Sequence, residues 1–294
     1  MSVSLKETAE GATAEPQPRL RMVASPGTFL VRGGMAIFLI LLLGVVSSVV
    51  VNSFATKWFD TWLPQGYTGS WYGAAWKDYD LTQVVTTTLL VAVAVVSISV
   101  IIGAPASYVL ARRNFPGKNV VMLVFLLPIM MPPITYGIPL ATLLTYLHLA
   151  PGLTGVILAN LVPSIPFVIL TMTPFIEQIN PAIESAARMC GANMFKLFTK
   201  ILAPLLIPGI LAAAVLVLVR TVGMFELTFL TSDSTSNTLV VALFNAMTGA
   251  GIRAQQSVDA MAVIYMLMMV VLLVIALRFV NPTQLVSQVK EDRD

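Results

Sequence analysis

The sequence predicts an all-α integral membrane protein with six transmembrane helices and with both termini in the cytoplasm. Its composition is 57% hydrophobic and only 11% charged, and its mean hydropathy is +0.87, far from the usage of soluble globular chains. Long charge-free stretches recur along the chain. Because unpaired backbone amides are too costly in lipid, we expect these stretches to be helices of roughly 20 residues or more.

Five stretches without a charged residue can supply the spans: Gly33–Val51, Leu81–Leu110, Asn119–Ile176, Ile201–Val219 and Ala260–Leu277. The third is too long for one helix, and its middle reads "LHLAPGLTG", a Pro/Gly turn. A single tilted helix there would need a bilayer about three times the normal thickness. We therefore predict two spans joined by a tight hairpin, which gives six spans in all.

The distribution of Lys and Arg sets the orientation, since cytoplasmic loops retain positive charge. With the N-terminus inside, 13 of the 17 basic residues are cytoplasmic, and only Lys57, Lys77 and Arg253 lie outside, with Arg220 near a span end. The predicted organisation is a disordered cytoplasmic tail (1–32), a six-helix transmembrane domain (33–280) and a second cytoplasmic tail (281–294). Within the domain, 52–80 is an outer segment and 177–202 a cytoplasmic loop.

All four tryptophans fall in the outer segment, where amphipathic rings favour the membrane interface. Anchoring and a docking surface for an external partner are both open interpretations. The single cysteine, Cys190, excludes an intrachain disulfide, and the single histidine, His148, has no metal-binding neighbours in sequence. No catalytic triad, carboxylate pair or phosphate-binding glycine loop can be assembled. We therefore predict that the chain is not an enzyme and binds no metal or cofactor itself.

The segment "NPAIESAARMCGANMFKLFTKILAP" predicts a short helix, a turn and a second helix on the cytoplasmic side. Asn180 is a good N-cap and Pro181 a good first helical residue. Gly191 can end the first helix in a left-handed turn, and Asn193 can cap the second. This arrangement is either an ordinary amphipathic connector or a lever that passes force to the membrane.

The same segment resembles the signature loop of binding-protein-dependent ABC importer permeases, in which Glu-Ala-Ala, three residues, Gly, nine residues, Ile, one residue and Leu-Pro recur. The matching positions are Ser185-Ala186-Ala187, Gly191, Ile201 and Ala203-Pro204. Ser185 replaces the glutamate of that pattern, Glu184 stands one residue earlier, and Ala203 replaces the leucine. "ASYVLARRNFPGK" (106–118) is similar to a second turn of the family, and the likeness covers roughly residues 81–280.

The resemblance implies the type I ABC importer permease fold and a location in the bacterial inner membrane. It implies ATPase-coupling residues Glu184, Ser185, Ala186, Ala187 and Gly191. Implied partners are a second permease subunit, two ATP-binding subunits that hold ATP and Mg, and a periplasmic or extracellular solute-binding protein. Since no Walker-type GxxxxGK[ST] motif occurs in this chain, ATP hydrolysis is expected on a separate subunit.

Polar residues inside spans are costly and often mark a pathway. The third span, "LLPIMMPPITYGIP", is rich in proline, so its helix must distort and its freed carbonyls should face protein or water. Thr135 and Tyr136 are therefore candidates to line the path, as are Asn160 and Ser164 in the fourth span. A packing kink and helix-to-helix hydrogen bonds are the alternative explanation.

Arg220 and Glu226 lie near the outer end of the fifth span, and Asp259 begins the sixth. Charge pairing is one interpretation of Arg220 and Glu226; the other is a weak site for a cationic solute at Glu226, to which Asp259 would add in an acidic vestibule of the pathway. Sugar-type members resemble Trp-Asn-Glu-Phe here, whereas this chain has Met224-Phe225-Glu226-Leu227. Together with likeness to polyamine-type permeases, this favours a putrescine- or spermidine-like substrate. A carbohydrate importer is the alternative, and a self-contained secondary transporter is a more distant one.

Overall fold

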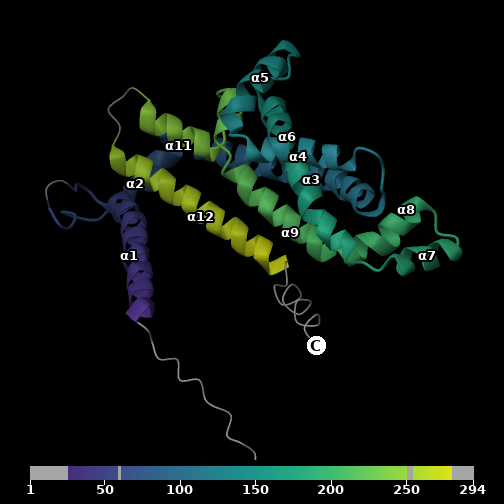
Figure 1. The fold of residues 1–294 in the computed structure, drawn as a ribbon. Coiled ribbons are helices and arrows are strands. Elements are labelled where there is room, and N and C mark those ends of the chain that lie inside the picture. Colours follow the sequence, from purple (N-terminus) through teal and green to yellow (C-terminus); the bar gives the residue numbers. More distant parts are fainter. Residues whose placement is uncertain (1–25, 59–60, 250–253, 280–294) are drawn as a thin grey trace, which may run out of the picture. The chain divides into compact units, whose positions relative to one another are not determined.

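The computed structural model describes residues 26–58, 61–249 and 254–279. In these ranges the regular elements are helices, joined by loops (Figure 1). Its helices are α1 (Pro26–Phe54), α2 (Ser70–Asp78), α3 (Leu81–Arg112), α4 (Lys118–Met130), α5 (Pro133–Tyr146), α6 (Leu153–Glu177), α7 (Pro181–Met189), α8 (Met194–Leu197), the π-helix η1 (Phe198–Leu202), α9 (Ala203–Val222), α10 (Glu226–Thr231), α11 (Leu239–Thr248) and α12 (Gln255–Phe279). No β-strand occurs in these ranges, where one isolated β-bridge pairs Ala55 with Tyr67.

The predicted span count agrees with the helices. Five of them are long and apolar enough to cross a membrane, or six if α4 and α5 form one broken span. These two helices meet at an angle of 98° around Pro132. Proline lacks the N–H that continues a helix, so the break stands where the proline-rich sequence predicts distortion. The predicted hairpin before the fourth span is the turn between α5 and α6.

The first helix begins earlier than the sequence predicts. The helix α1 begins at Pro26 rather than Gly33, so the expected disordered tail (1–32) is wrong for residues 26–32. Proline suits a first helical turn, because an N–H there has no partner within the helix. Residues 1–25 and the predicted tail 281–294 lie outside the described residues. The chain divides into two units, to Ser48 and from Val49, and the cores described next belong to the second.

The core of the second unit is built by α3, α6 and α9, which lie side by side. The packing of α3 on α6 is the most extensive helix contact of the described chain. Gly103 permits it, because a Cβ at that position would stand 2.6 Å from Cγ1 of Val168. Gly209 serves α9 in the same way, since its Cβ would stand 2.8 Å from Cγ of Phe175. Glycines at these crossings let the helix backbones approach closely.

The outer segment is more structured than the sequence predicts, because it contains α2 and because aromatic residues of α2 form hydrogen bonds with the residues around the end of α1. The Trp71 indole N–H donates to the carbonyl of Ala55 at 2.8 Å, and the Tyr72 hydroxyl lies 2.8 Å from the Ser53 hydroxyl. Trp62, in contrast, is 99% exposed. The helix α11 is unpredicted, and the Thr88 hydroxyl on α3 accepts the N–H of its first residue, Leu239, at 2.8 Å.

Candidate functional site

The cytoplasmic loop has the predicted backbone. The side chain of Asn180 accepts the N–H of Ala182 at 2.9 Å and caps α7, with Pro181 in the first turn. The chain then reverses at Gly191, whose φ of +81° is left-handed. Asn193 caps α8 by accepting the N–H of Lys196 at 2.8 Å. Each helix start therefore uses a side-chain acceptor to satisfy N–H groups that a helix leaves unpaired.

The exposed surface of this loop combines small and large apolar side chains with the cations Arg188, Lys196 and Lys200. Ser185 and Ala186 are exposed on α7, whereas Ala187 is half-buried against the core. Met189 is 90% exposed and Phe195, on α8, is 75% exposed. Large apolar side chains at such exposure, beside small ones that permit close approach, are typical of a protein-binding surface.

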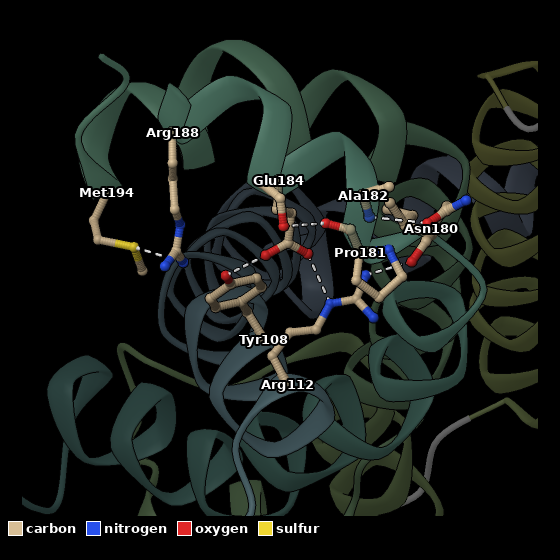
Figure 2. A network of polar contacts seen from close by, with 10 residues as sticks. Tyr108, Arg112, Asn180, Pro181, Ala182, Glu184, Arg188 and Met194 are labelled. Carbon is tan, nitrogen blue, oxygen red and sulfur yellow. Dashed lines mark hydrogen bonds and ion pairs between the residues drawn. The ribbon is translucent and has the colours of Figure 1, made fainter. Parts of the chain in front are cut away.

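Glu184 points inward, toward α3 (Figure 2). It is 7% exposed and accepts the Tyr108 hydroxyl at 2.6 Å and the Arg112 Nε–H at 2.7 Å. A second guanidinium nitrogen of Arg112 donates to the carbonyl of Ile179 at 2.5 Å. We call Tyr108, Arg112 and Glu184 the Glu184 clamp. Its ion pair is the only one within the described parts of the chain.

Beyond Asn193 the chain forms one long helical segment, from Met194 to Val222, that runs from the loop into an apolar span. Leu197, Leu202 and Leu206 are its fully buried side chains nearest the loop, and all three belong to the α3–α6–α9 core. The loop is therefore joined to the membrane helices by its backbone at both ends, to α6 and to α9, and in addition by the side chains of the Glu184 clamp.

The predicted pathway residues separate into two groups. Asn160 and Ser164 are 1% and 2% exposed. The Asn160 amide donates to the carbonyl of Val156 at 2.9 Å and to the hydroxyl of Thr228 at 3.3 Å. Ser164 donates to the carbonyl of Asn160 at 2.7 Å. Two of these hydrogen bonds lie within α6 and the bond to Thr228 joins α6 to α10, as the packing explanation expects.

Tyr136, Arg220 and Glu226 form the second group, and all three are half-buried. Tyr136 interacts electrostatically with both charged side chains. Its buried hydroxyl has no hydrogen-bond partner in the described residues. Arg220 and Glu226 form no ion pair with each other; the guanidinium of Arg220 instead lies 5.7 Å from the ring centre of Phe167. Thr135, one residue before Tyr136, is exposed.

Three aromatic rings pack together where the chain reaches Glu226. Phe225, adjacent to Glu226, has its ring centre 5.2 Å from that of Phe229 and 4.7 Å from that of Phe244. Phe229 and Phe244 are 44% and 38% exposed. A carboxylate beside open aromatic faces is a combination that can attract an organic cation.

Asp259 has a different environment from the one that the sequence suggests. One carboxylate oxygen accepts the Asn52 amide at 2.5 Å and the other accepts the Gln255 amide at 3.1 Å. The bond from Asn52 joins the end of α1 to the start of α12, and the bond from Gln255 lies within α12. A role in an acidic vestibule stays a prediction for this residue.

Residues 103–284 match the family model described as "Binding-protein-dependent transport system inner membrane component". The chain belongs to this family. The match begins at Gly103, within α3, and includes the Glu184 clamp, the capped loop and the polar group around Tyr136. The chain is therefore a multi-pass protein of the inner membrane, and it is a permease of the ABC importer class.

Several curated permeases are similar to this one. A probable ABC transporter permease, y4oR, of Sinorhizobium fredii is 31% identical over 163 residues, 55% of this chain and 58% of that protein. The trehalose transport system permease protein SugB of Mycobacterium tuberculosis is 36% identical over 122 residues, 42% and 44% of the two chains. The spermidine/putrescine transport system permease protein PotC of Escherichia coli K12 is 30% identical over 190 residues, 64% and 71%. The permease thus spans about half the length of the first two relatives.

The solved structures confirm the fold. A bacterial ABC transporter involved in import of the acidic polysaccharide alginate has a chain that matches with a TM-score of 0.74 and 19% identity. The match covers 89% of this permease and 99% of that chain. The protein therefore has the type I ABC importer permease fold that the motif spacing implies.

Sequence reasoning did not find the partners of Glu184. The sequence predicts Arg112 only as one of the cytoplasmic positive charges, and it assigns no role to Tyr108. The available signal was their spacing of four, which places both side chains on one face at the end of a span. Tyr108 and Arg112 stand 76 and 72 residues before Glu184, so nothing local in the sequence connects them to it.

Proposed function

We propose that this permease is the transmembrane subunit of an ATP-driven, binding-protein-dependent importer, and that it forms half of the pathway for a small polar organic solute. The observation that carries the proposal is the capped cytoplasmic loop, whose exposed small and apolar side chains fit a protein partner. Ser185, Ala186 and Gly191 shape the docking surface and its turn. Ala187 packs behind the surface, and Glu184 holds α7 in place.

The proposed assembly has three further kinds of subunit. A second permease, either another copy or a related chain, completes the pathway. Two ATP-binding subunits hold ATP and Mg and dock against α7 and α8. A periplasmic solute-binding protein delivers the substrate outside; the alginate importer crystallised with its periplasmic protein is a supporting case from a distant structure. ATP hydrolysis on separate subunits fits the absence of a phosphate-binding loop motif in this sequence.

For the substrate, we favour a polyamine of the putrescine or spermidine type. Glu226 has no ion-pair partner in the described chain and directly follows Phe225, whose ring packs with Phe229 and Phe244. An ammonium group is attracted both by a carboxylate and by aromatic faces. The likeness to PotC, which extends over 64% of this chain, supports the same choice.

A carbohydrate is the second candidate, and a different observation favours it. Tyr136 offers an unpartnered hydroxyl, and Arg220 beside it offers several N–H donors without an ion-paired carboxylate. Such donors suit a solute with many hydroxyl groups. The likeness to the trehalose permease SugB points the same way.

Uptake into proteoliposomes tests the function. The permease is reconstituted with the ATP-binding and solute-binding proteins encoded beside it, with ATP inside, and radiolabelled putrescine, spermidine and trehalose are supplied in turn. The proposal expects uptake that needs both ATP and the solute-binding protein. Uptake by the permease alone, driven by an ion gradient, would establish a secondary transporter instead.

The variant Glu226→Gln separates the two substrate classes. Removal of the carboxylate should lower polyamine uptake about tenfold, the loss expected for one charge-assisted contact of ~1.4 kcal/mol, and leave trehalose uptake unchanged. Glu177→Gln is the matched control, because Glu177 is exposed at the end of α6 and makes no ion pair. If Glu226→Gln transports polyamines like the wild type, the cation site is elsewhere.

A further inference from the structure

We infer that the Glu184 clamp makes α7 and the cytoplasmic end of α3 move as one body, so that a force applied to the loop reaches α3 directly. The inference rests on the proposed function, in which an ATP-binding subunit moves α7. It assigns Tyr108 and Arg112 as positioning residues for transport. Neither belongs to the loop motif itself.

The clamp holds the chain at two points, one just before α7 and one within its first turn. One guanidinium nitrogen of Arg112 donates to Glu184, in the first turn of α7, and another donates to the carbonyl of Ile179, just before α7 begins. Tyr108 holds the second carboxylate oxygen of Glu184. A carboxylate with both oxygens bound and a guanidinium with two acceptors can shift only if several hydrogen bonds break together.

Burial strengthens these contacts. The side chains of Arg112 and Glu184 are only 14% and 9% exposed. Charge-assisted hydrogen bonds are the strong class, and salt and water screen them less when the charges are buried. The ring of Tyr108 also packs edge-on against Phe198 of η1, with ring centres 6.3 Å apart, so the clamp touches the second helical arm of the loop as well.

Outside the clamp, the contacts of α7 with α3 are few: Arg188 of α7 also interacts with Tyr108, and Ala187 packs against the core that contains Tyr108. Backbone packing between them is slight, and most of α7 is exposed, including Ala182, Ser185 and Met189. The long side chains of the clamp therefore bridge a gap that the backbones leave open. Since α3 has its most extensive contact with α6, a displacement of α7 passes through the clamp into the α3–α6 pair. The chain connection through η1 carries the same displacement into α9.

The first test measures transport coupling, the amount of substrate imported per ATP hydrolysed, in the complete reconstituted importer. Arg112→Met and Tyr108→Phe should each lower this ratio, about tenfold or more for Arg112→Met, which loses two charge-assisted bonds. The charge exchange Arg112→Glu with Glu184→Arg should recover part of the loss caused by Arg112→Glu alone. Arg113→Met is the matched control, because Arg113 is exposed and makes no ion pair in the described chain.

A ratio equal to the wild type in both Arg112→Met and Tyr108→Phe would overturn the inference. So would a loss of complex assembly in every clamp variant without recovery in the charge exchange, since the clamp would then serve folding alone. Tyr108→Phe removes only one hydroxyl, so it keeps the test open if the charge variants fail to fold.

A second measurement does not depend on transport. Spin labels are attached to the permease alone in detergent, at exposed positions on α7 (Ser185→Cys) and at the end of α3 (Arg113→Cys), with Cys190→Ser as background. The wild-type clamp should give one narrow distance distribution, and Arg112→Met a broad one. Equal widths would overturn the inference even if the importer works. A narrow wild-type and a broad variant distribution support it even if ATP-driven uptake fails.

Discussion

Substitutions at Gly191 should lower the assembly and transport activity of the importer in proportion to how poorly each new residue adopts the left-handed backbone conformation. The φ of this residue is +81°, and a Cβ there would meet no atom within 4 Å, so space does not limit the substitution. The left-handed conformation itself costs a residue with a Cβ about 1–2 kcal/mol. Asparagine tolerates it best, alanine less and a β-branched residue least.

Proline at this position should have the largest effect. Its ring holds φ near about −65°, the opposite sign from the one required. It also removes the N–H that Gly191 donates to the carbonyl of Arg188 at 2.9 Å. Together these changes should cost about 3 kcal/mol or more, which displaces the native turn in most molecules.

The assay is co-purification with the ATP-binding subunit, followed by ATP-driven uptake in proteoliposomes. We expect the order Gly, Asn, Ala, Val, Pro from highest to lowest, with a roughly 5- to 30-fold fall in the native turn population for alanine. Gly73→Ala is the control, since Gly73 lies inside α2 with an ordinary φ and nothing within 4 Å. Equal activity of the Asn, Val and Pro variants would refute the reasoning.

Three further outcomes follow from single contacts. Gly103→Ala should destabilise the chain by about 1–3 kcal/mol in thermal unfolding, because the new Cβ overlaps Val168, whereas Gly44→Ala, with open space, should not. Asn180→Ala should cost α7 its cap, about 1 kcal/mol, measured as faster amide exchange in the loop. Hydrogen bonds from Ser236 and Thr235 lower the pKa of Asp233 from 3.8 to about 2, so the turn at 233–236 is stabilised above the unfolded pKa. Its exchange protection should hold down to about pH 4 and disappear as the pH falls through about 2.

The local features of this permease were predictable because short-range chemistry determines them. Asn180, Asn193 and Gly191 act within a few residues of themselves, through caps and a left-handed turn, and the structure confirms all three. The break at Pro132 follows in the same way from a missing N–H. Composition and charge-free length were enough to indicate the spans.

Long-range features were not predictable from one sequence. The direction of Glu184 depends on Tyr108 and Arg112, which the fold brings to it from another helix. Asp259 is held by Asn52 from 207 residues earlier. The helix α11 is only 10 residues long, too short for a span, and its N-cap residue Thr238 makes no capping hydrogen bond; the N–H of Leu239 is satisfied by Thr88 from α3 instead.

The π-helix between the loop and the membrane gives the chain a tolerance to changes in length. Leu197 and Leu202 are five residues apart and both fully buried in one core, as the i to i+5 repeat of a π turn allows. On a regular α-helix that spacing would rotate the second leucine by ~140° from the first. Deletion of the exposed residue Thr199 would therefore convert η1 into an ordinary α-helical turn and keep both leucines on the buried face. A deletion within α9 would instead rotate everything on one side of it by ~100°, so length variation in this segment should be found at η1.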